Sequence, residues 1–439
     1  MKFGTDGVRG VANTDLTAAF ALDLGRAAAR VLGGKEAVVG GDTRVSTAML
    51  EAAFVAGLAS EGVVVHRLGV VPTPAVAFEA SRRDVMGAVI SGSHNPFYDN
   101  GIKIFARGGT KLPDDVEERI EREVLALPAP TGEPAQLHDA EDSPDYVSHV
   151  LESIEGRSLA GMRIVVDAAN GAAYELAPRL FARGGADVIA ISVTPDGRNI
   201  NDHCGATHTA ALSETVVEHG ADLGLALDGD ADRLMAVDHE GRLVDGDHIM
   251  AICAGDLHRR GLLRDATVVA TVMSNLGFRL AMEQAGITVV ETAVGDRYVL
   301  EALDDGGFTM GGEQSGHVIF RDRATTGDGL LTGIMLADIV KRSGGPLAEL
   351  AAGSMTRLPQ VLVNVPVRER VADAADQVAD EIAAVEAKLA GSGRVLLRPS
   401  GTEPLLRVMV EATDDALAHE VADHLVAVVK SRWGVLADS

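Results

Sequence analysis

Three aspartates at alternate positions are the first candidates for chemistry in this chain. They are Asp228, Asp230 and Asp232. In an extended segment, residues two apart project to one side, so the three carboxylates would repel one another unless a cation joined them. All-oxygen ligation suits Mg²⁺, with Ca²⁺ and Mn²⁺ as competitors. An EF-hand is excluded because Arg233 and His239 stand where that loop needs glycine and glutamate. An acidic surface turn without a metal is the alternative.

A serine far upstream could carry a phosphoryl group for such a cation to bind. Ser93 is followed by His94, Asn95 and Pro96. A serine hydroxyl is a weak nucleophile unless a base or a metal activates it, and a phosphate on it would add oxygen ligands to the metal. His94 and Asn95 can orient the loop by hydrogen bonds, and the proline fixes the backbone after it. Chemistry alone does not separate Ser93 from Ser91, and an ordinary turn is also compatible with the local sequence.

Basic residues occur within neighbouring motifs. Lys103 could act as an acid or base, or could hold phosphate charge. Arg9 lies in the segment 4–10, whose glycines predict a loop brought to a site rather than a strand. Arg233 directly follows the aspartates. The three cations are therefore candidates to contact a phosphoryl group.

Two further loops offer binding groups. Near the C-terminus, guanidinium groups, hydroxyls and glycine-permitted backbone N–H groups predict a phosphate site. Its members are Arg398, Ser400, Gly401, Thr402 and Arg407. A glycine-bounded loop holds Glu313 and Ser315, with His317 beyond, and could read sugar hydroxyls or an amine. Plain turns remain the alternative for both loops.

Composition limits the classes of protein that fit. The chain has 439 residues, too many for one ordinary core, with 46% hydrophobic and 23% charged residues. Its net charge of -25 argues against nonspecific nucleic-acid binding and against an anionic membrane surface. The sequence has no apolar run long enough to span a bilayer, and because its first residues lack the long apolar core of a signal peptide, none is expected. With only two cysteines, we expect a reducing, cytoplasmic environment.

Apolar runs that alternate with helical stretches predict an α/β fold, with site loops at the carboxyl ends of strands. Strands are expected at 37–40, 63–66, 86–90, 163–167, 188–193, 223–227, 234–237, 267–272, 288–290, 394–397 and 405–410, with helices at 46–60, 114–127, 278–285 and 414–429. The segment 131–144 is interpreted as a polar surface connection, 358–367 as a linker, and 371–389 as one amphipathic helix.

The motifs, taken in chain order, resemble the α-D-phosphohexomutase superfamily, and within it the amino-sugar branch. The resemblance rests on the segments 4–10, 93–96, 228–233, 312–317 and 398–404, and runs essentially end to end. Gln314 is typical of the amino-sugar branch. The family implies four domains around a central cleft: three related α/β domains with mixed sheets, and a smaller C-terminal α+β domain with a TATA-binding-protein-like sheet. We place them at 1–150, 151–246, 247–361 and 362–439.

The resemblance also assigns roles. The family's phosphoserine directly precedes His-Asn-Pro, which selects Ser93. Its phosphate and the three aspartates would hold Mg²⁺. The implied catalytic residues are Ser93, Lys103, Arg9 and His94, and Arg233 would stabilise charge. The implied sugar-binding residues are Glu313, Ser315 and His317. The implied phosphate-binding residues are Arg398, Ser400, Gly401, Thr402 and Arg407.

The implied activity is the interconversion of glucosamine 6-phosphate and glucosamine 1-phosphate in the cytoplasm. Glucosamine 1,6-bisphosphate would be both intermediate and activator, and the product would feed UDP-N-acetylglucosamine and cell-wall synthesis. The general base and the oligomeric state stay open, with a homodimer as one option. A mutase for mannose or glucose phosphates is the main alternative. A Mg²⁺-dependent phosphatase would instead release inorganic phosphate, and a binding protein would have no need of both Ser93 and the aspartates.

Overall fold

The computed structural model describes residues 3–4, 6–130, 133–139, 144–400 and 404–435. The chain divides into two units. The larger unit comprises Met1–Met273 and Ala285–Ser354, and the smaller unit comprises Ser274–Gln284 and Met355–Ser439.

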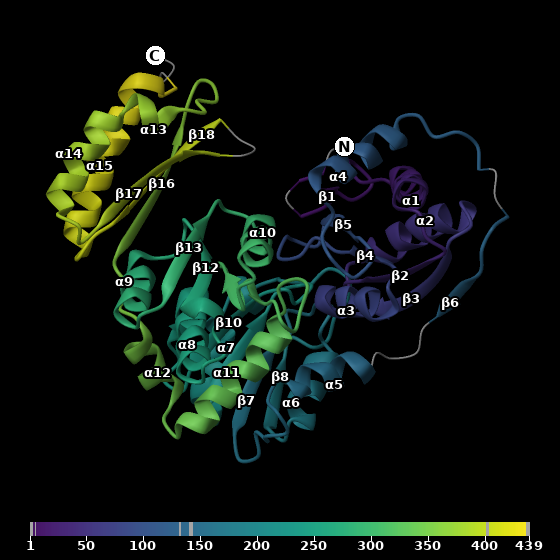
Figure 1. Ribbon diagram of the computed structural model, residues 1–439, viewed down its shortest axis with the longest axis horizontal. Coiled ribbons are helices and arrows are strands. Elements are labelled where there is room, and N and C mark those ends of the chain that lie inside the picture. The colour runs from purple at the N-terminus through teal and green to yellow at the C-terminus, as the bar shows by residue number, and fades with distance from the viewer. Residues whose placement is uncertain (1–2, 5, 131–132, 140–143, 401–403, 436–439) are drawn as a thin grey trace. The chain divides into compact units, whose positions relative to one another are not determined.

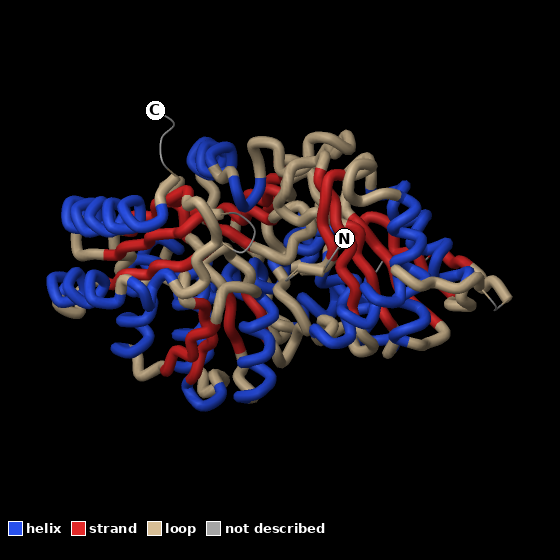
Figure 2. Tube along the Cα trace, turned by 90° about the horizontal axis from the view of Figure 1, so that it is seen from above, coloured by secondary structure: helices blue, strands red, loops and turns tan. Residues whose placement is uncertain are grey.

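The larger unit begins with a six-stranded mixed sheet in the order β1-β5-β4-β2-β3-β6. Strands β1 and β5 run antiparallel to their neighbours and the other pairs are parallel. Helices cover both faces, with α1 and α2 on one side and α3 on the other (Figures 1 and 2). The elements are β1 (Val8–Val11), α1 (Ala18–Leu32), β2 (Glu36–Gly41), α2 (Thr47–Ser60), β3 (Val64–Val70), α3 (Thr73–Arg83), β4 (Met86–Ile90), β5 (Asp99–Phe105), α4 (Asp114–Val124), β6 (Leu137–Asp139) and α5 (Pro144–Glu152).

Glycines allow α1 and α2 to pack in close contact. A Cβ atom on Gly25 would lie 2.2 Å from the carbonyl oxygen of Phe54, and one on Gly57 would lie 2.1 Å from that of Leu22. Any larger residue would therefore push the two helices apart, away from the buried core of this sheet.

A second sheet has the order β11-β10-β9-β7-β8. Strands β9 and β10 form an antiparallel hairpin, and its connection carries the three aspartates. The elements are β7 (Arg163–Asp167), α6 (Leu176–Arg183), β8 (Asp187–Ile191), α7 (Ala210–His219), β9 (Leu223–Leu227), β10 (Leu234–Asp238) and β11 (Leu243–Val244), with a 3-10 turn at Gly205–Thr207.

A third sheet has the order β13-β12-β14-β15. The β14–β15 hairpin carries the loop of Glu313 and Ser315. The elements are α8 (Gly246–Arg259), β12 (Thr267–Thr271), β13 (Thr288–Thr292), α10 (Asp296–Gly306), β14 (Met310–Gly312), β15 (Val318–Phe320), α11 (Gly329–Ser343) and α12 (Leu347–Ser354), with a 3-10 turn at Arg264–Ala266.

The smaller unit is an antiparallel sheet in the order β16-β18-β17, with α14 and α15 packed on one face (Figure 1). Its elements are α9 (Leu276–Gln284), β16 (Gln360–Pro366), α13 (Ala374–Gln377), α14 (Ala379–Leu389), β17 (Arg394–Pro399), β18 (Leu405–Glu411) and α15 (Asp415–Trp433). The buried carboxylate of Glu411 accepts hydrogen bonds from the Leu276 backbone N–H, Asn275 and Arg394, which ties the start of α9 to the sheet.

Three expectations from the sequence were wrong, two of them because pairing with a distant strand decides the structure. Residues 8–10 of the expected loop 4–10 belong to edge strand β1, because β5 supplies a hydrogen-bonding partner. The expected linker 358–367 is largely β16, paired with β18. The helix expected at 371–389 is broken at Val378, whose φ of -120° and ψ of 27° are not helical. The expected polar surface connection 131–144 holds the short, exposed edge strand β6, and its residues 131–132 and 140–143 lie outside the described residues.

The expected α/β class, with a smaller C-terminal sheet unit, is confirmed. The four domain boundaries stay predictions, and the structure places an element across each of the three junctions: α5, α8 and β16. Within the described ranges, no helix combines the length and apolar character needed to cross a membrane.

Candidate active site

The β9–β10 connection brings three carboxylates into one buried cluster. Asp228, Asp230 and Asp232 are at most 3% exposed, and their ligand oxygens lie within 4.8 Å of one another. The burial excludes the exposed acidic turn. Within the loop, Ala231 adopts a left-handed φ of 56°. The Gly329 N–H donates to the Ala231 carbonyl at 3.0 Å and holds the loop in this shape.

This cluster fits a hard divalent cation. Oδ1 of Asp230 and Oδ1 of Asp232 are buried and have no hydrogen-bond partner among the residues that the structure describes. Burial, followed by repulsion from Asp232 and Asp230, raises the pKa of Asp228 well above its usual range. A cation would satisfy the bare oxygens and remove the repulsion, and an all-oxygen donor set suits Mg²⁺.

Ser93 lies against this cluster, on the loop after β4. Its side chain is fully buried, and Oγ donates to Oδ2 of Asp228 at 2.8 Å. Ser91 faces another way: its Oγ donates to Oδ2 of Asp42 at 2.6 Å and accepts from the Ser93 N–H at 2.9 Å. The structure therefore separates the two serines, which the chemistry of the hydroxyls alone could not.

Lys103, on β5, also reaches the aspartate cluster. Its Nζ lies 2.8 Å from Asp230, 2.9 Å from Asp232 and 2.8 Å from Asp6. Burial opposes its charge, but these three carboxylates outweigh burial and hold the pKa of Lys103 well above its usual range. Of the two roles that the sequence left open, this geometry favours holding charge over removing a proton.

Asp6 is a residue that sequence reasoning missed. Its carboxylate pairs with Arg9, Lys103 and Lys111. Burial alone would raise its pKa, yet Lys103, then Lys111 and Arg9, hold the pKa of Asp6 well below its usual range. Its position three residues before Arg9, in a glycine-rich segment, was the available signal.

Thr73 is another missed residue, and it begins α3. Its hydroxyl donates to Oδ2 of Asp230 at 2.6 Å, and its backbone N–H donates to the Asp230 carbonyl at 2.9 Å. The N-terminus of α3 thus fixes the central aspartate. Nothing in the local sequence around Thr73 indicates this contact.

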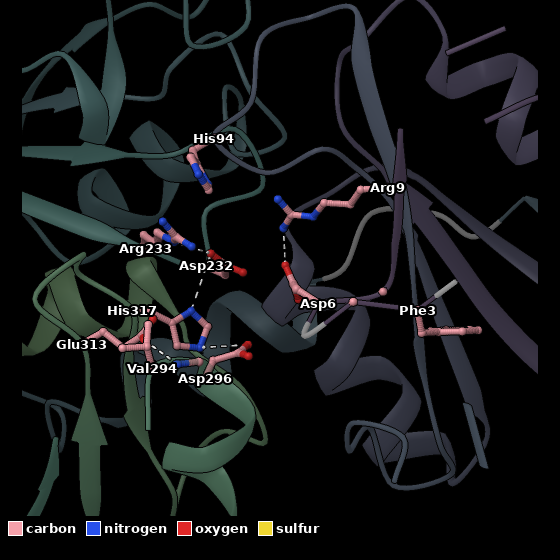
Figure 3. A pocket seen from close by; sticks show the side chains of 13 residues that line it. Phe3, Asp6, Arg9, His94, Asp232, Arg233, Val294, Asp296, Glu313 and His317 are labelled. Carbon is pink, nitrogen blue, oxygen red and sulfur yellow. Dashed lines mark hydrogen bonds and ion pairs between the residues drawn. The ribbon is translucent and has the colours of Figure 1, made fainter. Parts of the chain in front are cut away.

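A cavity of about 440 Å³ opens beside the aspartates (Figure 3). Arg9 and Asp6 enter it from the first sheet, while Arg233, His317 and Glu313 face them from the other side. Its lining is Phe3, Gly4, Asp6, Gly7, Arg9, His94, Asp232, Arg233, Val294, Gly295, Asp296, Glu313 and His317. Carboxylates and basic side chains therefore line the same cavity, which could bind a ligand that carries both hydroxyl groups and negative charge.

The β14–β15 loop contributes three of the predicted residues. Nδ1 of His317 lies 3.7 Å from Asp232, and Nε2 lies 3.7 Å from Asp296. Oε1 of Glu313 accepts from the Gly295 N–H at 3.1 Å, and the Ser315 hydroxyl lies 3.4 Å from Oε2 of Glu313. Asp296, at the start of α10, was not predicted from the sequence.

His94 also lines the cavity, with Nδ1 3.2 Å from Oγ of Ser93. Burial, then the positive charges of Arg233 and Arg9, lower the pKa of His94 to about 4. Its imidazole is therefore neutral near pH 7 and can exchange a hydrogen bond with the serine.

The predicted phosphate residues lie in the smaller unit. Arg398 on β17 and Arg407 on β18 are cross-strand neighbours. Burial, then repulsion from Arg407, lowers the pKa of Arg398. The Ser400 N–H donates to the Leu405 carbonyl at 2.9 Å. Gly401 and Thr402 lie outside the described residues.

Four family models match the chain in order. They are described as the alpha/beta/alpha domains I, II and III and the C-terminal domain of phosphoglucomutase/phosphomannomutase, and they match residues 1–129, 144–241, 245–358 and 362–428. The chain belongs to the phosphoglucomutase/phosphomannomutase family.

Relatives within this family agree over nearly the full length. The chain is 56% identical to a phosphoglucosamine mutase of Thermobifida fusca, covering 99% of each chain. It is 55% identical to one of Rhodococcus opacus, covering 98% of this chain and 99% of that one. A phosphoglucomutase/phosphomannomutase family protein of Burkholderia thailandensis has a similar structure, with a TM-score of 0.82, 28% identity and 97% coverage of both chains.

A more distant structure shows the same fold. It is an Aspergillus fumigatus N-acetylphosphoglucosamine mutase in complex with GlcNAc-6P and magnesium, with a TM-score of 0.71, 19% identity, and coverage of 98% of this chain and 96% of that one.

The phosphoglucomutase/phosphomannomutase fold thus gathers the predicted residues into two groups. Ser93, His94, Lys103, Arg9, Arg233, the three aspartates, Glu313, Ser315 and His317 belong to the larger unit, and Arg398, Ser400 and Arg407 belong to the smaller one. Within the larger unit, the serine, aspartate and sugar loops come from three different sheets. Their roles stay predictions until variants are assayed.

Proposed function

We propose that this chain interconverts glucosamine 6-phosphate and glucosamine 1-phosphate, through a phosphoserine at Ser93 and a glucosamine 1,6-bisphosphate intermediate. The observation that carries the proposal is the buried Oγ of Ser93, 2.8 Å from Asp228, beside buried oxygens of Asp230 and Asp232 that have no hydrogen-bond partner among the described residues. The relatives that share more than half of the sequence are named phosphoglucosamine mutases.

Asp228, Asp230 and Asp232 would hold Mg²⁺ together with an oxygen of the Ser93 phosphate. When bound, the cation would offset negative charge on the phosphoryl oxygens. The orphan oxygens of Asp230 and Asp232 support this assignment.

The chain's own residues then position the transfer. The free hydroxyl of the sugar attacks the phosphorus of the phosphoserine, the bond between phosphorus and Oγ of Ser93 breaks, and the hydroxyl proton passes to a nearby base. Arg9 and Arg233 face the cavity where charge would accumulate. Lys103 stays protonated and keeps the aspartates in place.

The second half-reaction reverses the first. The bisphosphate turns over, its other phosphate faces Ser93, and transfer back to Oγ regenerates the phosphoserine. Arg398, Ser400, Gly401, Thr402 and Arg407 would hold the phosphate that is not transferred, and Glu313, Ser315 and His317 would read the sugar. The full burial of Ser93 supports the exclusion of water, which would otherwise hydrolyse the phosphoserine.

Initial rates on glucosamine 6-phosphate, mannose 6-phosphate and glucose 6-phosphate test the proposal, each with Mg²⁺ and a trace of its bisphosphate. We expect the highest kcat/KM for the amino sugar. A preference for mannose or glucose phosphate would instead establish the sister activity and show that the interpretation of Gln314 was wrong. Stoichiometric release of inorganic phosphate would identify a phosphatase.

A further inference from the structure

The backbone carbonyls on either side of His94 are held by two side chains from different parts of the chain. The Ser93 carbonyl accepts from Nη2 of Arg44 at 3.1 Å and from Nδ2 of Asn201 at 2.9 Å. The Asn95 carbonyl accepts from the same two nitrogens, at 3.1 Å in the case of Asn201. Two side chains therefore make four hydrogen bonds to two carbonyls around the reactive serine.

The aspartate loop also packs against this point. A Cβ atom on Gly229 would lie 2.5 Å from the Ser93 carbonyl oxygen and 2.9 Å from Nδ2 of Asn201. The absence of a side chain at position 229 lets the loop backbone touch both groups. The loops that carry Ser93, the three aspartates and Asn201 thus all meet at the Ser93 carbonyl.

Arg44 is itself fixed. Its side chain and that of Asp42 are fully buried and form an ion pair. Asp42 also accepts from the Thr47 hydroxyl at 2.7 Å and from the Ser91 hydroxyl at 2.6 Å. Ser91 in turn accepts from the Ser93 N–H. The N–H and the carbonyl of Ser93 are therefore both bound to the same buried network.

Asn201 approaches from the second sheet, in the connection between β8 and the turn at Gly205–Thr207. It is 8% exposed, has a left-handed φ of 58°, and donates its own N–H to the Ala169 carbonyl at 2.9 Å. Asparagine tolerates this conformation better than most residues. Its amide is thus presented to the serine loop from a rigid turn.

These contacts hold an unfavourable backbone conformation in place. Ser93 has a φ of 53°, in the left-handed region that a serine rarely adopts. Such a conformation persists only where the surroundings determine it. In this conformation Oγ of Ser93 points at Asp228.

We propose that Asn201 is a positioning residue for phosphoryl transfer: with Arg44, it locks Ser93 in the left-handed conformation that aims Oγ at the aspartates. Ser93 lies in the loop after β4 of the first sheet, and Asn201 lies in the loop after β8 of the second sheet. The contact between these two loops therefore fixes the direction of the Ser93 side chain. This inference rests on the proposed function, because it assigns a role in transfer through Ser93.

Two substitutions test it. Asn201→Asp keeps the size and tolerates the left-handed conformation, but it replaces the N–H donor with an oxygen that repels both carbonyls. Asn201→Gly keeps the backbone freedom and removes the donor without adding repulsion. We expect kcat on glucosamine 6-phosphate to fall on the order of 100-fold for Asn201→Asp and less for Asn201→Gly, with KM little changed.

Asn199→Asp is the matched control. Asn199 lies in the same loop, and its amide also donates to a backbone carbonyl, that of Thr194, at 3.0 Å. The control should leave kcat unchanged and lower Tm by less than Asn201→Asp, because the hydrogen bond of the Asn199 amide is exposed. If both aspartate variants lower kcat equally, or if Asn201→Asp retains the wild-type kcat, the positioning role is wrong.

Crystal structures of the three variants separate this inference from the proposed function. The left-handed φ of Ser93 and its contact with Asp228 should persist in Asn199→Asp and be lost in Asn201→Asp, whatever substrate the enzyme uses. A wild-type enzyme that turns over no glucosamine 6-phosphate would overturn the proposed function alone. An unchanged Ser93 conformation in Asn201→Asp would overturn the positioning role alone.

Discussion

The buried aspartate cluster in the larger unit and the Arg398–Arg407 pair in the smaller unit differ in how their charges are balanced. Around the aspartates, positive groups are already present: Lys103 bridges Asp230, Asp232 and Asp6. On the hairpin, Arg398 and Arg407 stand side by side across two strands, and their mutual repulsion contributes to the lowered pKa of Arg398. Nε of Arg407 is buried and has no hydrogen-bond partner among the described residues.

The difference indicates how each region would use a ligand. The aspartate cluster is held by protein contacts without a ligand, as catalysis by preorganised charge would require. The hairpin instead concentrates like charge that an anion would neutralise. We therefore expect changes in the first region to act mainly on kcat, and changes in the second to act mainly on KM.

The largest effect is expected from Ser93→Ala. Removal of the hydroxyl removes the group that would carry phosphate, so kcat should fall by more than about 1000-fold, as for loss of a covalent nucleophile. Ser60→Ala, at the end of α2, is the control and should retain activity, because the Ser60 hydroxyl donates to the nearby Gly57 carbonyl and lies outside the candidate site. Steady-state assays check both, and wild-type turnover by Ser93→Ala would exclude a phosphoserine at this position.

Asp228→Asn should lower kcat by more than about 100-fold. Loss of a group that only supports a metal ligand typically costs about 10- to 100-fold, and loss of a ligand itself should cost more. In the presence of a chelator at about pH 7, the same variant should be more stable than wild type by about 1 kcal/mol. Burial, then repulsion from Asp232 and Asp230, raises the pKa of Asp228, so the wild-type carboxyl must take up a proton on folding, which the neutral asparagine does not need. Added Mg²⁺ should raise the Tm of wild type and not that of the variant. Thermal unfolding with and without Mg²⁺ measures this, and a destabilised variant in chelator would contradict it.

Arg407→Ala should lower kcat/KM by about 10- to 100-fold, mostly through KM, because it removes a charged hydrogen bond to phosphate worth about 1.5–3 kcal/mol. Its Tm should not fall much, since repulsion with Arg398 is relieved. Arg432→Ala, on α15 of the same unit, removes an exposed arginine paired with Glu381 and serves as control. An effect on kcat alone would contradict the assignment of Arg407 to substrate binding.

The smallest effect on activity is expected from Asp328→Asn, beside the aspartate loop, which should change stability alone. Asp328 accepts from the Tyr146 hydroxyl at 2.9 Å and caps α11 through the Leu331 N–H at 2.9 Å. Burial raises its pKa to about 6, roughly two units above the unfolded value of about 3.9. The folded state therefore binds the proton more tightly, and this contribution to stability is present below about pH 4 and lost as pH rises through 6.

Relative to wild type, Asp328→Asn should therefore gain up to about 3 kcal/mol between pH 4 and pH 7. The difference in Tm between the two proteins, followed over that range, measures the gain. A difference that does not vary with pH would show that Asp328 is ionised in the folded protein throughout.

The residues that sequence alone could identify are those whose chemistry is local. Asp228, Asp230 and Asp232 are recognisable because alternate carboxylates on a strand connection have few other uses. The bounds of β4, β7 and β9 were predicted correctly because each is a short apolar run that ends at a polar loop. The alternate valines of β16 carried a strand signal that the interpretation as a linker overlooked.

Other features depended on partners that lie far away in the sequence. Asp6 meets Lys103, Thr73 meets Asp230, and Asn201 meets Ser93, each across about a hundred residues or more. Ser91 and Ser93 have the same hydroxyl, and only the direction of each side chain in the folded protein decides which one faces the aspartates. The sequence by itself determined the chemical groups and the strands that present them. The tertiary structure decided which groups are buried together, because packing between sheets fixes contacts that no local pattern encodes.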